Sequence, residues 1–331
     1  MRRRRVAVLG ATGMVGQSYL LKLEQHPWFE VVALAASPRS AGRRYLEAAS
    51  WVQQEGIPAA FTGMELLPPS AAAIRASGAE LVFSALPSEA ARELESELAT
   101  SGLKVVADTA AHRMDPEVPL VIPEVNGEAV SALSGPGYIV SSPNCSTIGL
   151  AMTLAPLQRH LGLSRVCVTT LQAVSGAGYR GVPSMAILDN VVPYIANEEE
   201  KIRRETHKIL GADFEIYAQC TRVPVLAGHL ETVFAELAAE VELPRLRELI
   251  TDLPALGLPS SPERPLLLRE ETDRPQTRLD REAGGGMTTS LGRLRLEGRM
   301  LRYVLLSHNT VRGAAGNAIL IAELLVSRGL A

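Results

Sequence analysis

The chain has 331 residues, of which 47% are apolar and 21% charged, and its formal net charge is −3. A chain of this length is expected to form roughly two domains with sizeable cores, and its composition excludes wholesale disorder. The near-neutral balance excludes a protein that holds nucleic acid or an anionic membrane by its overall charge. The opening basic run, residues 2–5, precedes a short apolar stretch and a glycine-rich turn, so we expect neither a signal peptide nor a membrane-spanning segment there.

The first part of the chain alternates strand-like and helix-like stretches. Short apolar runs predict strands over residues 5–9, 31–36, 81–85 and 105–107, and amphipathic patterns predict helices over 15–25 and 88–100. Strands that alternate with helices are typical of a parallel, doubly wound sheet. We therefore expect an α/β fold that begins with a Rossmann-type domain.

A glycine-rich turn follows the first predicted strand and opens the first predicted helix. It reads Gly10-Ala11-Thr12-Gly13-Met14-Val15-Gly16. Glycine lets the backbone turn tightly and approach a pyrophosphate, whose charge the amides at the helix start then face. The turn predicts a dinucleotide site, and a purely structural turn is the alternative.

The loop after the second predicted strand distinguishes between the two nicotinamide cofactors. Enzymes that use NAD usually carry an acid there, which binds the ribose 2′-hydroxyl. Residues 36–43 contain no acid, whereas Ser37, Arg39 and Ser40 offer hydroxyl groups and a guanidinium that suit a 2′-phosphate. We therefore expect NADP, with an exposed basic loop as the alternative.

The pattern of the chain changes near Ser141. The elements expected after it are a helix at 148–160, strands at 165–173, 222–225, 231–241 and 299–307, loops at 259–274 and 284–286, and a long helix at 309–329. Pro224 limits the second of these strands to an edge or irregular strand. This part of the chain is expected to form a second domain, of the α+β class.

The three cysteines are Cys145, Cys167 and Cys220, and none lies in a Cys-x-x-Cys motif. We therefore expect no disulfide framework and no metal site, and a reducing, cytoplasmic compartment. Cys145 lies between a turn and a helix, where amides at the helix start lower a thiol pKa and stabilise a nearby oxyanion. It is the best candidate nucleophile, with an inert cysteine as the alternative.

A catalytic thiol needs an acid/base partner. His229 follows Gly228 where a strand-like stretch is broken, and a histidine in such a place can reach into a cleft. Spacing alone leaves a satisfied structural histidine open as the other interpretation.

Several short motifs occur in one order along nearly the whole chain. They are residues 10–16, 37–42, 84–87, 143–147, 172–178, 197–201, 222–229 and 313–317. Together they resemble the aspartate-semialdehyde dehydrogenase family, in the branch shared by archaeal and fungal enzymes. That family reduces L-aspartyl 4-phosphate with NADPH to L-aspartate 4-semialdehyde, in the biosynthesis of lysine, threonine, methionine and isoleucine.

The resemblance implies roles for particular residues. Cys145 matches the nucleophile that forms a thioester, and His229 matches the acid/base. Arg222 matches the group that binds the substrate α-carboxylate, and Glu198 matches the acid that faces its α-ammonium. The remaining substrate matches are Lys201, Arg113 and Asn144 for the phosphate and Gln172 for the acyl centre.

The resemblance also implies the cofactor contacts and the assembly. The matching cofactor residues are Gly10, Thr12, Gly13, Met14, Val15, Gly16, Ser37, Arg39, Ser40, Ser84, Ala85, Leu86, Ser175, Gly176 and Asn317. Residues 1–143 would bind NADP, with the helix at 309–331 packing back onto them, and residues 144–308 would carry catalysis and dimerisation. The family habit implies a homodimer or a homotetramer.

Two departures and three alternatives remain, and one of the departures is the segment 259–274, which matches no motif of the family. Asp108 stands near a position where the family commonly begins with Ser-Asn, and a carboxylate pointing inward there would repel a phosphate. Malonyl-CoA reductase resembles this branch and keeps the cysteine and histidine, but its substrate has no α-ammonium for Glu198 to meet. A non-catalytic NADP-binding protein is the alternative from another class. N-Acetyl-glutamyl-phosphate reductase matches less well, because the context of its cysteine differs from Asn144-Cys145-Ser146.

Overall fold

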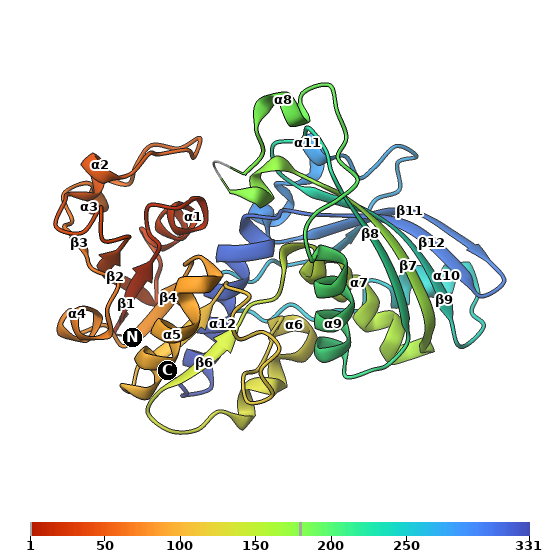
Figure 1. Ribbon diagram of the computed structural model, residues 1–331. Helices are drawn as coiled ribbons and strands as arrows, with labels where there is room; N and C mark the ends of the chain where they lie inside the picture. The colour runs from red at the N-terminus through yellow and green to blue at the C-terminus, as the bar shows by residue number, and fades with distance from the viewer. Residues whose placement is uncertain (1, 179–180) are drawn as a thin grey trace.

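The computed structural model describes residues 2–178 and 181–331, which form two six-stranded sheets lying side by side (Figure 1). The predicted α/β class is confirmed: a parallel sheet in the first part of the chain is followed by a mixed sheet. Within residues 2–178 and 181–331, no helix is long and apolar enough to cross a membrane.

The first sheet is parallel and has the strand order β3-β2-β1-β4-β5-β6. Its strands are β1 (Arg4–Leu9), β2 (Phe29–Ala35), β3 (Leu66–Leu67), β4 (Leu81–Ser84), β5 (Lys104–Ala107) and β6 (Tyr138–Ser141). Its helices are α1 (Met14–Leu23), α2 (Tyr45–Ala48), α3 (Ala59–Thr62), α4 (Ala71–Ala76), α5 (Ser88–Thr100) and α6 (Pro123–Asn126). The strand order reverses between β1 and β4, and ligands of doubly wound sheets bind at the carboxyl ends of the strands beside such a reversal.

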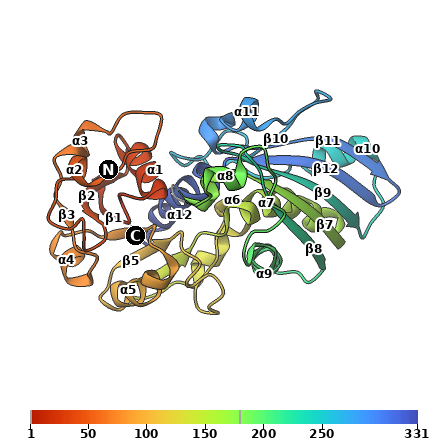
Figure 2. The same cartoon turned by 45° about the horizontal axis from the view of Figure 1, so that its top comes forward.

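The second sheet is mixed, with the order β10-β11-β12-β9-β7-β8. Its strands are β7 (Leu163–Gln172), β8 (Glu215–Arg222), β9 (His229–Leu237), β10 (Leu266–Leu268), β11 (Thr289–Glu297) and β12 (Met300–Ser307). The helices of this part are α7 (Cys145–Leu161), α8 (Ser184–Ile187), α9 (Glu198–Leu210), α10 (Leu243–Leu249) and α11 (Thr277–Asp280). Both views place α9 beside β8 (Figures 1 and 2).

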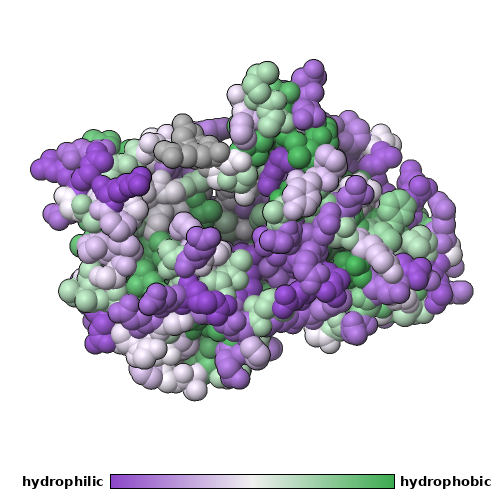
Figure 3. All heavy atoms as spheres, viewed as in Figure 1, coloured by the Kyte–Doolittle hydropathy of each residue, from purple (hydrophilic) through white to green (hydrophobic). Residues whose placement is uncertain are grey.

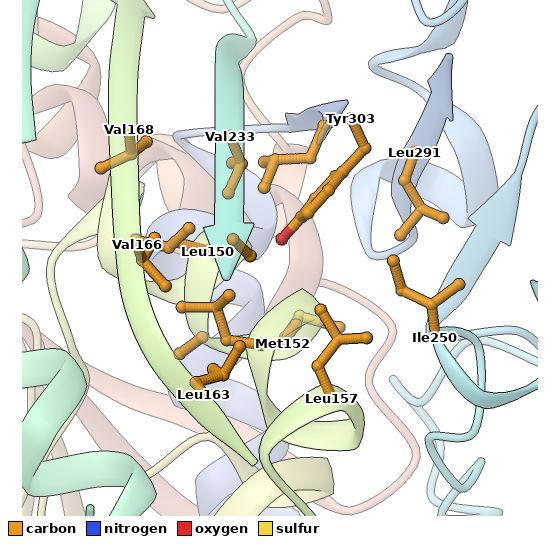
Figure 4. Close-up of a cluster of buried hydrophobic side chains, with 14 of the residues drawn as sticks. Leu150, Met152, Leu157, Leu163, Val166, Val168, Val233, Ile250, Leu291 and Tyr303 are labelled. Atoms are coloured by element: carbon orange, nitrogen blue, oxygen red, sulfur yellow. The ribbon is translucent and has the colours of Figure 1, made fainter. Parts of the chain in front are cut away.

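A buried core joins α7 to the second sheet (Figure 4). Leu150 and Leu157 of α7 pack with Val166 and Val233 of the sheet, and all four are completely buried. This packing fixes the helix against the sheet. It therefore also fixes the position of Cys145, the first residue of α7, relative to the strands.

The last helix, α12 (Gly316–Ser327), packs with the first sheet rather than the second. Its Ile319 and Ile321 lie in one core cluster with Val6 and Val8 of β1. Figure 1 accordingly shows this blue helix among the red and orange elements. The chain therefore crosses from the second sheet back to the first after β12.

Four sequence expectations are corrected by the structure. The strand predicted at 222–225 is wrong, because β8 ends at Arg222 and Pro224 cannot donate to a ladder. The strand predicted at 231–241 ends at Leu237. The predicted loop at 259–274 contains β10, a short strand that pairs with β11. The single helix predicted at 309–329 is interrupted, since Val311–Ala315 forms a π-type turn with Ala314 at φ −155°.

Candidate active site

Cys145 and His229 meet at the junction of α7 and β9. The Sγ of Cys145 lies 3.2 Å from Nε2 of His229, within hydrogen-bond range for sulfur. Cys145 is the first residue of α7, and the Asn144 side chain caps that helix by accepting from the amides of Ser146 and Thr147 at 3.0 and 3.3 Å. His229 is the first residue of β9. The two side chains selected from the sequence as nucleophile and acid/base are thus in direct contact.

Burial sets the charge state of this pair. Burial raises the pKa of the Cys145 thiol to about 12, and the charge of Glu198 acts in the same direction, against Arg113 and Arg222. The lowered thiol pKa expected at a helix start is therefore wrong, because burial outweighs the opposing effect of the Ser146 amide. Burial also lowers the pKa of His229 to about 3, helped by the nearby charge of Arg222. Without substrate, the site therefore holds a neutral thiol and a neutral imidazole.

The backbone fixes the tautomer of His229. The amide of Ala173 donates to Nδ1 of His229 at 3.1 Å. Because Nδ1 accepts this bond, the proton of the neutral ring is on Nε2, the atom that faces Cys145. The turn after Ala173 also lies close: a Cβ on Gly176 would be 3.1 Å from Cε1 of His229.

Glu198 connects three side chains around the thiol. It is 5% exposed, and its Oε1 accepts from Asn144 Nδ2 at 2.8 Å and from Gln172 Nε2 at 3.3 Å. Lys201, one helical turn along α9, places Nζ 3.4 Å from its Oε2. Within the motif at 197–201, Glu198 and Lys201 therefore lie near the thiol, whereas Glu199 and Glu200 are exposed.

Arg222 supplies a positive charge beside the pair. It ends β8, is 7% exposed, and donates from Nη1 to the Ala173 carbonyl at 2.7 Å. A guanidinium carries five N–H donors, so this bond does not exhaust its capacity to bind a carboxylate.

Arg113 lies behind the thiol, in the loop that follows β5. It donates to the Ser142 carbonyl at 2.9 Å, to the Asp108 carbonyl at 2.7 Å and to Glu205 at 3.1 Å. The other oxygen of Glu205 accepts from the Asn144 amide at 2.6 Å. The guanidinium therefore supports the loop that carries Cys145, and the predicted phosphate contact stays a prediction.

Asp108 turns its carboxyl toward α1. Its Oδ2 accepts a hydrogen bond from the Tyr19 hydroxyl, and burial raises its pKa to about 6. Among the described residues, Oδ2 is therefore partnered by α1, whereas Oδ1 is buried without a hydrogen-bond partner.

The glycine-rich turn lies between β1 and α1, as expected. Gly10 has φ +71°, and a Cβ there would lie 2.5 Å from the Ala85 carbonyl oxygen, so the turn and the loop after β4 touch through backbone. A Cβ on Gly16 would lie 2.2 Å from the Gly10 oxygen. The N-cap of α1, Gly13, provides no side-chain cap, so the helix start offers amides to an anion.

The other predicted cofactor residues lie at the carboxyl ends of β1, β2 and β4, except for Ser175, Gly176 and Asn317. Ser37 and Arg39 are exposed in the turn after β2, where the Ser40 amide donates to the Ser37 carbonyl at 2.8 Å. Ser84, Ala85 and Leu86 end or follow β4, while Thr12, Met14 and Val15 lie in the glycine-rich turn and the first turn of α1. Asn317 differs from all of these, because it is completely buried and donates to the Ser142 hydroxyl at 3.0 Å. Its cofactor contact stays a prediction.

Sequence reasoning missed several contributors. The Ala173 amide and the Glu205 carboxylate have no local signal, because each acts through a tertiary contact. Gly313, in one of the quoted motifs, had a detectable signal: a Cβ there would lie 2.7 Å from Cβ of Cys145.

Two family models match the chain. Residues 5–133 match the model described as semialdehyde dehydrogenase, NAD binding domain. Residues 154–312 match the model described as semialdehyde dehydrogenase, dimerisation domain.

Named relatives match over nearly the full length. An aspartate-semialdehyde dehydrogenase of Archaeoglobus fulgidus is 46% identical over 338 residues, covering 97% of each chain. The protein of that name from Methanothermobacter thermautotrophicus is 48% identical over 343 residues, covering 97% of this chain and 98% of the other. Among solved structures, aspartate semialdehyde dehydrogenase with NADP from Candida albicans has a TM-score of 0.91 and 37% identity, and the match covers 100% of both chains.

Proposed function

Because the chain belongs to the aspartate-semialdehyde dehydrogenase family, we propose that it reduces L-aspartyl 4-phosphate with NADPH to L-aspartate 4-semialdehyde, releasing NADP and phosphate. One observation carries this proposal: the thiol of Cys145 lies 3.2 Å from His229, beside side chains that complement an amino acid. This reaction would serve amino-acid biosynthesis.

The charges around the thiol complement each group of the substrate. Arg222 would bind the α-carboxylate through its remaining N–H donors, and Glu198 would accept from the α-ammonium. Lys201, whose side chain is 36% exposed, would meet the phosphate, with Arg113 and Asn144 as further contacts. Gln172, 3.3 Å from Glu198, would orient the acyl group beside Cys145.

The first chemical step forms a thioester. The Sγ of Cys145 bonds to the acyl carbon as the bond to the phosphate oxygen breaks. The thiol proton leaves with the phosphate, because Nε2 of His229 already carries a proton and cannot accept another. In this step His229 stabilises the sulfur by N–H donation.

The second step reduces the thioester. NADPH, when bound, supplies the hydride. The acyl oxygen gains negative charge, and the N–H of His229 would stabilise it, whereas the amides of Ser146 and Thr147 already donate to Asn144 Oδ1. As the carbon–sulfur bond breaks, His229 donates to the departing thiolate, which then takes a proton from solvent.

We further propose that NADP binds along the carboxyl edge of the first sheet. The turn from Gly10 to Gly16 would hold the pyrophosphate, supported by the uncapped start of α1. Ser37, Arg39 and Ser40 would meet the 2′-phosphate, and Ser175 and Gly176 the nicotinamide.

Residues 1–143 and 144–308 are proposed as the cofactor and catalytic domains, and the chain as a homodimer or homotetramer. The match of residues 154–312 to a dimerisation domain supports self-association. Met185 and Leu188, at α8, are 87% and 63% exposed, and Figure 3 shows hydrophobic residues at the surface over that helix. We propose a cytoplasmic location, supported by the cysteines, which are free throughout the part of the chain that the structure describes.

The test compares two substrates. With aspartate semialdehyde, phosphate and NADP, the purified enzyme is expected to form NADPH at a rate that depends on phosphate. Oxidation of NADPH with malonyl-CoA, and no reaction with the semialdehyde, would instead assign the enzyme to malonyl-CoA reduction.

A further inference from the structure

Asn309 lies where two backbone segments around His229 meet. It follows β12, whose last residue, Ser307, pairs with His229 on β9. Asn309 is 3% exposed; its Oδ1 accepts from the Gly228 amide at 2.8 Å, and its Nδ2 donates to the Ser175 hydroxyl at 2.9 Å. Because the Gly228 amide can only donate, the orientation of the carboxamide is fixed by chemistry.

Both partners of Asn309 lie in backbone segments that carry or contact His229. Gly228 precedes His229 in the chain, so its amide fixes where β9 begins. Ser175 belongs to the turn whose Gly176 approaches the imidazole and which begins beside Ala173, the donor to Nδ1. One carboxamide thus joins the backbone that carries the imidazole to the turn that contacts it.

The segment that carries Asn309 also contacts the nucleophile. Four residues after Asn309, Gly313 packs so closely that an added Cβ would lie 2.7 Å from Cβ of Cys145. Between them, Arg312 forms a completely buried, two-pronged ion pair with Glu124 at 2.6 and 2.7 Å. The segment 309–313 is therefore anchored to the first half of the chain and touches the surroundings of both Cys145 and His229.

We propose that Asn309 is a positioning residue: it holds Nε2 of His229 within reach of Sγ and fixes the Ser175 turn that would face the nicotinamide. The inference rests on the proposed function. A carboxamide is suited to this place because it accepts from one segment and donates to the other. Alanine can do neither.

The experiment uses Asn309→Ala, Ser175→Ala and the double variant. We expect Asn309→Ala to lower kcat about 100-fold and Ser175→Ala about tenfold, because small displacements of reacting groups are costly. The KM for aspartate semialdehyde should change little, whereas the KM for NADP should rise in both variants. Since both substitutions break the same hydrogen bond, the double variant should fall no further than Asn309→Ala alone.

A second measurement needs no substrate. The rate at which iodoacetamide alkylates Cys145 reports the hydrogen bond from His229 to the sulfur. It should fall about tenfold in Asn309→Ala, as expected for a rise of one pKa unit in the thiol. This measurement keeps the inference testable even where the enzyme shows no turnover with the semialdehyde, a result that would count against the proposed function alone.

Asn126 provides a matched control, since its Oδ1 accepts from the Ile122 amide at 2.9 Å and its Nδ2 donates to the Leu120 carbonyl at 2.8 Å. Asn126→Ala should lower the unfolding temperature and leave kcat and the alkylation rate unchanged. Asn309→Ala with the same behaviour would show that Asn309 is only structural and would overturn the inference. If Asn309→Ala does not fold, a wild-type kcat in Ser175→Ala would overturn it equally.

Discussion

The amide of Ala173 donates to Nδ1 of His229 at 3.1 Å, and this one bond determines which nitrogen of the imidazole carries its proton. The proton is on Nε2, 3.2 Å from Sγ of Cys145. To accept a proton from the thiol, the ring would have to become an imidazolium and lose the Ala173 bond. Burial and the charge of Arg222 oppose that change, because they lower the pKa of His229 to about 3. Because of this backbone bond, the imidazole is a neutral N–H donor that does not take the thiol proton, which differs from the acid/base role that the resemblance implies.

The tautomer is directly measurable. In ¹⁵N NMR spectra of the imidazole, His229 should show a protonated Nε2 and an unprotonated Nδ1 at neutral pH. His229→Gln, whose amide can also donate to sulfur, should keep more activity than His229→Ala. Equal losses in the two variants, or an imidazolium signal near neutral pH, would contradict N–H donation as the role of this side chain.

Gly313 is expected to be sensitive to a single methyl group. A Cβ there would lie 2.7 Å from Cβ and 3.0 Å from Cα of Cys145, so Gly313→Ala must displace the nucleophile. We expect kcat to fall about 100-fold, with intact folding shown by circular dichroism. Gly292→Ala is the control, because its Cβ would meet the Arg274 carbonyl at 2.5 Å, away from Cys145. Gly292→Ala should lose stability and keep its turnover. A similar loss of kcat in both variants would show that the effect of Gly313→Ala does not come from its position beside Cys145.

Asp108 makes the stability of the fold depend on pH. Burial raises its pKa from 3.8 to about 6, so across that range the folded protein binds more protons than the unfolded chain. The free energy of unfolding therefore decreases as the pH rises through this range, and the loss persists above it. Asp108→Asn removes the charge and keeps an acceptor for the Tyr19 hydroxyl.

We expect Asp108→Asn to be more stable than wild type above pH 6 and equally stable near pH 3.8. The gain should be at most about 1.4 kcal/mol for each unit of pKa shift, and urea unfolding at several pH values measures it. Asp213→Asn, at an exposed position, serves as the control. A gain that does not vary with pH would mean that the Asp108 carboxyl is not its source.

Arg39 should decide between the two nicotinamide cofactors. It is exposed in an acid-free turn after β2, where a guanidinium can form an ion pair with a 2′-phosphate, whereas the 2′-hydroxyl of NAD carries no charge. Arg39→Ala is expected to weaken NADPH binding much more than NADH binding, as measured by fluorescence titration. Arg245→Ala, on α10, is the control and should leave both affinities unchanged. Equal weakening of both cofactors by Arg39→Ala would exclude the proposed 2′-phosphate contact.

Four strands of the first sheet, β1, β2, β4 and β5, could be predicted because they are short apolar runs. The strands β3 and β6 were not predicted. The second sheet could be predicted less well. β8 has exposed residues in its first half and buried polar residues, Thr221 and Arg222, at its end, so its apolar signal is weak. The apolar valines on both sides of Pro224 led to a strand predicted at 222–225, which shares only Arg222 with β8. β10 has only three residues and depends on its pairing with β11. No local sequence pattern reveals that pairing.

The same distinction applies to the site. Cys145 and His229 stand in recognisable local contexts, a helix start and a glycine before a strand. Asn309 does not, because its partners are distant in sequence: Gly228 lies 81 positions away and Ser175 lies 134. Glu205 accepts from the Asn144 amide, 61 positions away in sequence. Its local sequence is that of an ordinary charged residue on a helix surface. Such residues become visible only once strand pairing and helix packing bring the segments together.

The central claim is that Cys145 forms a thioester, and trapping that intermediate tests it most directly. The enzyme is mixed with aspartate semialdehyde and NADP without phosphate, quenched in acid and digested for mass spectrometry. Because phosphate is absent, the acyl group should remain on sulfur, and the peptide containing Cys145 should gain the mass of one aspartyl group as NADPH forms in a burst. Cys145→Ser should show neither signal. A burst of NADPH with an unmodified Cys145 peptide would contradict the account.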